Sequence, residues 1–117
     1  MLRVFSVMVG ASLLVSTALA HSSKEGTMPE DGAVLEVAPA EISILFDEAA
    51  TLTRVALTHS HGDVSDETRL DAPRDATDAA TLEAPDLGPG TYTVDWRALS
   101  SDGHPVNGSF SYTVTGD

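Results

Sequence analysis

The sequence predicts an all-β sandwich, and three observations carry that prediction. Short segments in which apolar and polar residues alternate recur along the chain, as expected for strands that bury one face. Clusters of glycine, proline, aspartate and asparagine separate these segments. Between residues 21 and 117 no segment has the apolar periodicity of an amphipathic helix. We therefore expect about seven strands in two packed sheets.

Four strands are predicted most clearly. Their alternating segments are EISILFDE (41–48), TRVALTH (53–59), TYTVDWRA (91–98) and SFSYTV (109–114). Turns are expected at Pro29–Gly32, His61–Asp63, Gly88–Gly90 and Asn107–Gly108. The polar segment from Asp63 to Thr81 predicts a loop with one or two short strands, in which Leu70 points inward.

A local signature refines the architecture to a Greek key. In LGPGTYTV, a leucine and a Gly-Pro-Gly turn precede Tyr92, which is typical of the tyrosine corner of Greek-key sandwiches. Alternatively, Tyr92 is simply a core aromatic residue. Trp96 is in phase with Tyr92 and is expected between the sheets.

The first twenty residues predict a secretory signal peptide. Arg3 precedes an apolar stretch, and Ala18-Leu19-Ala20 has the small-x-small pattern of a cleavage site. The apolar stretch is too short and too diluted by glycine and serine for a membrane anchor. We expect cleavage after Ala20, export of the chain and a single mature domain over residues 21–117.

The composition of that domain excludes several functions. It carries all 18 acidic residues and five basic ones, a net charge near −13, which argues against nucleic acid as a partner. The chain has no cysteine and therefore no disulfide, thiolate nucleophile or blue-copper ligand set. No calcium-loop pattern is present. The acidic composition favours solubility and cations.

Three residues together suggest a metal site. Cleavage after Ala20 would leave His21 with a free α-amine and an imidazole, which can chelate one ion from adjacent corners of a square. Asp102 and His104 lie two residues apart before Pro105, so both side chains can converge on the same ion. Three nitrogens and one oxygen suit Cu(II) better than tetrahedral Zn(II). Without His21, the Asp-Gly-His segment indicates only a turn.

The mature chain resembles the CopC family of periplasmic copper-resistance proteins. The resemblance rests on His21, TMPEDGAVL (27–35), PAEISILFDE (39–48) and above all GTYTVDWRALSSDGHPVNGSF (90–110). It implies a cupredoxin-like or immunoglobulin-like sandwich with Cu(II) bound by His21, Asp102 and His104. Met28 is the only methionine after residue 20, so the methionine-rich Cu(I) loop of some members is not expected. Lys24 and Glu25 stand where the family usually has an apolar first strand.

Other polar residues are weaker candidates for a functional role. His59 and His61, followed by Asp63, are a candidate for a weak second metal site or simply a polar strand end. Arg97 is a candidate to orient Asp102 or another acidic group by a charged hydrogen bond, or an edge-strand surface residue. Ser100 and Ser101 are interpreted as turn residues, because nothing near them in the sequence resembles a catalytic triad.

The functional expectation is a monomeric, non-enzymatic, periplasmic protein of copper homeostasis and resistance. It would sequester Cu(II) or deliver it to an inner-membrane copper-transport protein of the CopD type, without itself being embedded in the membrane. Two alternatives stay open. An N-terminal histidine paired with another histidine also forms the copper brace of monooxygenases, although Asp102 would occupy a position that oxygen activation needs open. The second alternative is a structural sandwich without a metal.

Overall fold

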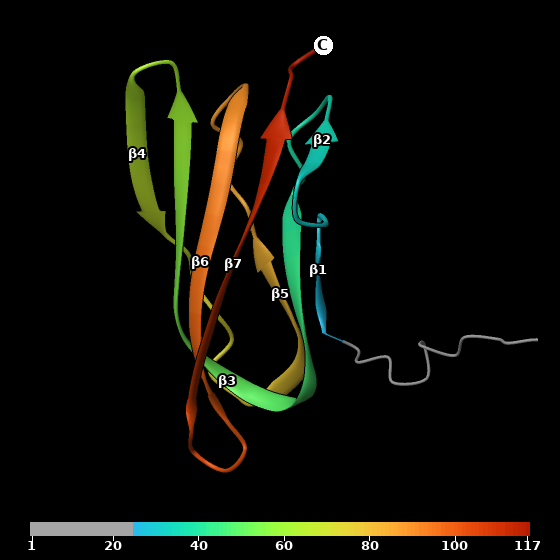
Figure 1. Cartoon of the computed structure of the whole chain (residues 1–117), viewed down its shortest axis with the longest axis vertical. Helices are drawn as coiled ribbons and strands as arrows, with labels where there is room; N and C mark the ends of the chain where they lie inside the picture. Colours follow the sequence, from blue (N-terminus) through green and yellow to red (C-terminus); the bar gives the residue numbers. More distant parts are fainter. Residues whose placement is uncertain (1–24) are drawn as a thin grey trace, which may run out of the picture.

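The computed structural model describes residues 25–117, and these residues form seven strands and no helix (Figure 1). The strands are β1 (Gly26–Met28), β2 (Ala33–Leu35), β3 (Glu41–His61), β4 (Val64–Arg69), β5 (Thr77–Glu83), β6 (Gly90–Ser100) and β7 (Pro105–Val114). The all-β prediction is therefore confirmed. The described part of the chain contains no helix that is long and apolar enough to span a bilayer.

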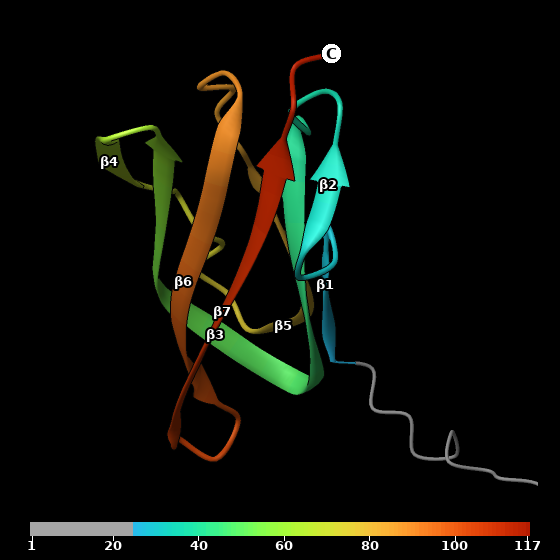
Figure 2. The same cartoon turned by 45° about the horizontal axis from the view of Figure 1, so that its top comes forward.

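The long strand β3 belongs to both layers of the fold. Its first part, up to Leu45, pairs with β1 on one side and β5 on the other. The register shifts between Leu45 and Ala50, and from Ala50 onward β3 pairs with β6 and then also with β4. β3 curls between the two layers at the bottom of Figure 1, and the turned view in Figure 2 shows the same bend. The layer that contains β6 continues through β7 to β2, which runs parallel to β7.

The core lies between these layers and consists of the alternating apolar residues that the sequence predicts. Ile42, Ile44 and Phe46 are buried from the first half of β3, and Val55 and Leu57 from the second half. Each of these sets has period two, because successive strand residues point to opposite faces of a sheet. The other buried members are Ala50, Leu52, Leu70, Ala80, Leu82, Tyr92, Val94, Ala98, Phe110, Tyr112 and Val114.

The tyrosine corner is present. The Tyr92 hydroxyl donates a hydrogen bond to the Gly88 carbonyl at 2.6 Å and accepts one from the Leu87 amide at 2.9 Å. Burial raises the pKa of this phenol, and the amide of Leu87 partly offsets the effect. The corner fixes the connection into β6, the strand that leads to the candidate metal loop.

Of two predictions about the segments between the main strands, one is confirmed and one is wrong. The polar segment from Asp63 contributes β4 and most of β5, and Leu70 is buried as predicted. The predicted turn at Asn107–Gly108 is wrong, because both residues lie inside β7 and pair with Arg97 and Trp96 of β6. The β6–β7 turn comes earlier, between Ser100 and Pro105.

Candidate metal centre

The tight hairpin between β6 and β7 carries the candidate ligands. The Gly103 amide donates to the Ser100 carbonyl at 2.8 Å, and the Ser100 amide donates to the His104 carbonyl at 2.8 Å. Gly103 has a φ of 85°, a left-handed conformation that glycine adopts without strain. These features are typical of a three-residue hairpin loop that ends in a glycine bulge. The Asp-Gly pair therefore forms the turn itself.

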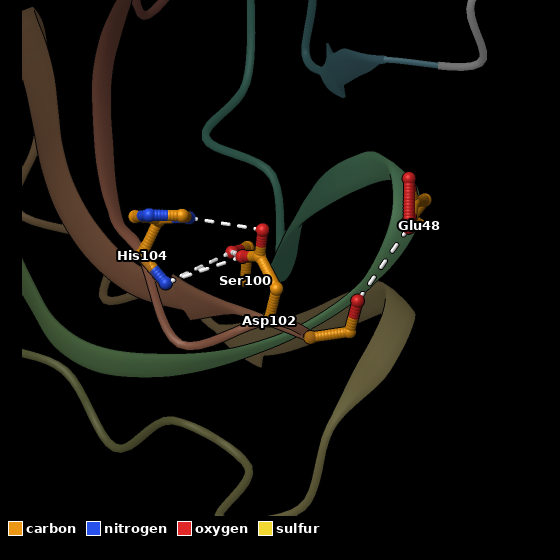
Figure 3. A network of polar contacts seen from close by, with 5 residues as sticks. Glu48, Ser100, Asp102 and His104 are labelled. Atoms are coloured by element: carbon orange, nitrogen blue, oxygen red, sulfur yellow. Dashed lines mark hydrogen bonds and ion pairs between the residues drawn. The ribbon is translucent and has the colours of Figure 1, made fainter.

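Within this loop the side chains of Asp102 and His104 face each other. Nδ1 of His104 lies 2.9 Å from Oδ2 of Asp102, and both side chains are largely exposed (Figure 3). The sequence predicted that the two residues converge, although through an extended backbone, whereas the structure brings them together through the turn. Two ligand atoms that each lie about 2.0 Å from an ion, at right angles, are separated by about 2.8 Å. The observed 2.9 Å is close to that spacing, and it is also the ordinary length of a hydrogen bond between these two groups.

The second oxygen of Asp102 is held inside the loop. The Ser100 hydroxyl donates to Oδ1, and the His104 amide lies 3.3 Å from the same atom. The Ser100 hydroxyl, followed by His104, lowers the pKa of the Asp102 carboxyl below its ordinary value. Asp102 is therefore a carboxylate over the neutral pH range, the form that a metal ligand requires.

A cavity of about 760 Å³ lies beside the loop. Its lining includes Asp102, the aromatic rings of Phe46 and Trp96, and the acidic residues Asp47 and Glu48 at the bend of β3. Phe46 and Trp96 meet edge to face, with ring centroids 5.3 Å apart. The concentration of carboxylates around an aromatic wall favours a cation over an anion at this place.

Glu48 connects the bend of β3 to the loop. Ser101 donates from its hydroxyl to Oε1 of Glu48 across 3.5 Å, and Figure 3 shows Glu48 opposite the labelled loop residues. Neither Glu48 nor the Ser100 contact was found from the sequence. Ser100 was interpreted as a turn residue, but it is the last residue of β6. The signal available was its alternation with Trp96, which places both residues on the same face of the sheet.

The predicted ligand His21 lies outside the described residues. Glu25, the first described residue, lines the same cavity as Asp102. In the sequence, residue 21 precedes Glu25 by four positions, and four residues of extended chain span at most about 14 Å.

Comparison with known proteins places the chain in a family. Residues 24–115 match the CopC domain. The chain belongs to the CopC family. Copper resistance protein C of Xanthomonas campestris pv. juglandis is 35% identical over 117 residues, covering 92% of this chain and 91% of that protein. The protein of the same name from Pseudomonas syringae pv. tomato is 33% identical over 119 residues, covering 94% of each.

Solved structures agree with this assignment. PcoC, a copper resistance protein from Escherichia coli, matches with a TM-score of 0.61 and 28% identity, covering 77% of this chain and 96% of that one. CopC from Methylosinus trichosporium OB3b matches with a TM-score of 0.59 and 28% identity, over 76% and 88% of the two chains. Both the fold class and the family resemblance drawn from the sequence are thereby confirmed.

Arg97 of this CopC domain lies away from the candidate ligands. It alternates with Trp96, so its exposed side chain leaves the sheet on the face opposite the cavity. Within residues 25–117 it makes no hydrogen bond or ion pair with Asp102. It is not an edge-strand residue either, because β6 is flanked by β3 and β7. Across the strands it faces Arg54 and Asn107.

His59 and His61 occupy the far end of β3 and differ in environment. His59 is 9% exposed, its Nε2 lies 3.0 Å from the Pro89 carbonyl, and its ring packs on Tyr92 with centroids 4.7 Å apart. His61 is exposed at the last position of the strand. These contacts give His59 a role in the core, so the weak second metal site stays a prediction that no contact supports. Among residues 25–117, no group of three or more His, Asp or Glu side chains is arranged to hold a metal.

Proposed function

We propose that this CopC-family protein binds one Cu(II) ion in the periplasm. The ligands are the α-amine and imidazole of His21, exposed by signal cleavage after Ala20, together with Asp102 and His104. The observation that carries the proposal is the 2.9 Å pairing of the Asp102 carboxylate with the His104 imidazole. Glu25, at the beginning of the described chain, and Asp102 line one cavity, which supports the participation of residue 21.

The proposed role is to carry copper as a monomer, without catalysis. The protein sequesters Cu(II) or passes it to a CopD-type membrane protein. The names of the relatives, copper resistance protein C, support a function in copper handling. A carboxylate ligand at Asp102 fills a coordination position that a copper monooxygenase needs for oxygen, which argues against an enzyme.

The decisive experiment compares two N-termini. A chain that begins at His21 and a chain that retains one extra residue before His21 are titrated with Cu(II) by calorimetry. The fluorescence of Trp96, the only tryptophan in the chain, is followed in parallel. Because the extra residue removes the primary amine from the chelate ring, affinity should fall more than about tenfold, roughly 1.4 kcal/mol. Equal affinity for the two chains would refute the proposed ligand set.

Ligand variants test the other half of the site. His104→Ala and Asp102→Ala should each weaken Cu(II) binding, and His104→Ala should do so more strongly because imidazole is the better copper ligand. His61→Ala, at the far end of β3, is the control and should leave the first equivalent of Cu(II) unchanged. An electron paramagnetic resonance spectrum that is identical in wild type and His104→Ala would exclude His104 as a ligand.

A further inference from the structure

We infer that Ser100 is a positioning residue that presents one oxygen of Asp102 to the copper ion. The inference rests on the proposed function and adds a residue to that site. It starts from the place of Ser100 at the end of β6, where the sheet passes into the hairpin loop.

Every polar group of Ser100 is used within the loop. Its amide donates to the His104 carbonyl, and its carbonyl accepts from the Gly103 amide. Its hydroxyl donates to Oδ1 of Asp102 and accepts from the His104 amide at 3.2 Å. Ser100 therefore ties the turn that carries both candidate ligands to the last residue of a central strand (Figure 3).

This arrangement distinguishes the two oxygens of Asp102. Oδ1 is held by the Ser100 hydroxyl and the His104 amide, whereas Oδ2 faces the His104 imidazole. Within residues 25–117, the hydrogen bonds that other residues make to the Asp102 side chain come from Ser100 and His104. The carboxylate is otherwise exposed, and of the two groups on Oδ1 the charged oxygen's nearer partner is the Ser100 hydroxyl rather than the His104 amide at 3.3 Å. Ser100 thus fixes a single oxygen beside the imidazole, at the spacing of two adjacent ligands.

Ser100 also faces the correct side of the sheet. It alternates with Trp96 and Ala98, so its hydroxyl emerges on the cavity face. Trp96, Ser100 and Asp102 all line the cavity. A donor at position 99 would begin on the opposite face, and the hydroxyl at position 101 contacts Glu48 instead of Asp102, so the role depends on this position and not only on serine being present in the loop.

The test uses variants that separate the hydroxyl group from the shape of the side chain. Ser100→Ala removes the hydroxyl, whereas Ser100→Thr and Ser100→Val have nearly the same shape and differ only in its presence. Cu(II) affinity should fall about 10- to 100-fold in the Ala and Val variants, the usual effect of losing a partner that orients a ligand. The paramagnetic resonance spectrum of bound copper should change with it, and the Thr variant should restore both.

Controls separate positioning from folding. Ser60→Ala removes a hydroxyl that bonds to Ser65 at the far end of β3, and it should leave copper binding unchanged. In an Asp102→Ala background, Ser100→Ala should cause no further loss, because Ser100 acts through that carboxylate. Equal losses in both backgrounds, or equal behaviour of the Thr and Val variants, would overturn the inference.

Failure of this inference and failure of the proposed function give different results. If the wild-type chain beginning at His21 binds no Cu(II), the proposed function fails. If that chain binds Cu(II) and the Ala and Val variants match it in affinity and spectrum, only the role of Ser100 fails.

Discussion

The indole ring of Trp96 lies directly over Gly108 of the neighbouring strand. The two residues face each other in the β6–β7 register, and a Cβ atom added at position 108 would come within 2.5 Å of Cζ2 of the ring. Glycine is therefore required here for the close approach of a side chain, not for a turn. The indole also forms part of the cavity wall beside Asp102, so this contact couples the core to the candidate site.

Gly108→Ala should displace Trp96. Because the added methyl group overlaps the ring, we expect a loss of about 1–3 kcal/mol in the free energy of unfolding, as for other overpacked positions. Urea unfolding measures the loss, and the emission of the single tryptophan should shift to longer wavelength as the ring gains contact with water. Gly26→Ala is the matched control, since nothing lies within 4 Å of its added Cβ. Unchanged stability and emission in Gly108→Ala would contradict this packing.

The fold was predictable from the sequence wherever a local sequence pattern determines the structure. Alternation identified the buried residues of β3, and the Gly-Pro-Gly turn before Tyr92 correctly indicated the tyrosine corner. Asn107–Gly108 has the composition of a turn, but the glycine is needed because the Trp96 ring on the neighbouring strand leaves no room for a Cβ atom at position 108. Composition does not reveal such a partner, because the contact depends on the strand register.

The pairing of Asp102 with His104 was predictable from the sequence, but the contacts that support it were not. The spacing of Asp102 and His104 indicated that they converge, while the hydroxyl of Ser100 beneath them depends on the loop geometry. His59 was open to interpretation as a surface ligand because its polar neighbours suggested exposure. Its ring is buried against Tyr92, and its Nε2 lies 3.0 Å from the carbonyl of Pro89, a neighbour thirty residues along the chain that the sequence alone does not reveal.

Removing the hydroxyl group from each of two stacked tyrosines should change the free energy of unfolding differently. The rings of Tyr92 and Tyr112 lie 4.9 Å apart and nearly parallel, and both are buried. Tyr92→Phe leaves the Leu87 amide and the Gly88 carbonyl without their partner and should cost about 1–3 kcal/mol of unfolding free energy.

Tyr112→Phe provides the comparison for that prediction. The Tyr112 hydroxyl is buried and has no hydrogen-bond partner among residues 25–117, so its removal should be neutral or slightly stabilising. Thermal unfolding of the two variants, which lose the same atom from stacked rings, measures the difference. A Tyr112→Phe variant as unstable as Tyr92→Phe would show that the hydroxyl of Tyr112 has a partner after all.

Alkaline pH should destabilise the protein through Tyr112. Burial, with a smaller effect of Tyr92, raises its pKa from 10.0 to about 12. The unfolded chain therefore loses this proton at a lower pH than the folded protein does. The contribution of Tyr112 to the free energy of unfolding is fully present below pH 10 and is lost as the pH rises towards 12. A shift of this size corresponds to about 3 kcal/mol. Urea unfolding across this range should show a smaller decline in Tyr112→Phe than in wild type, and parallel curves would contradict the prediction.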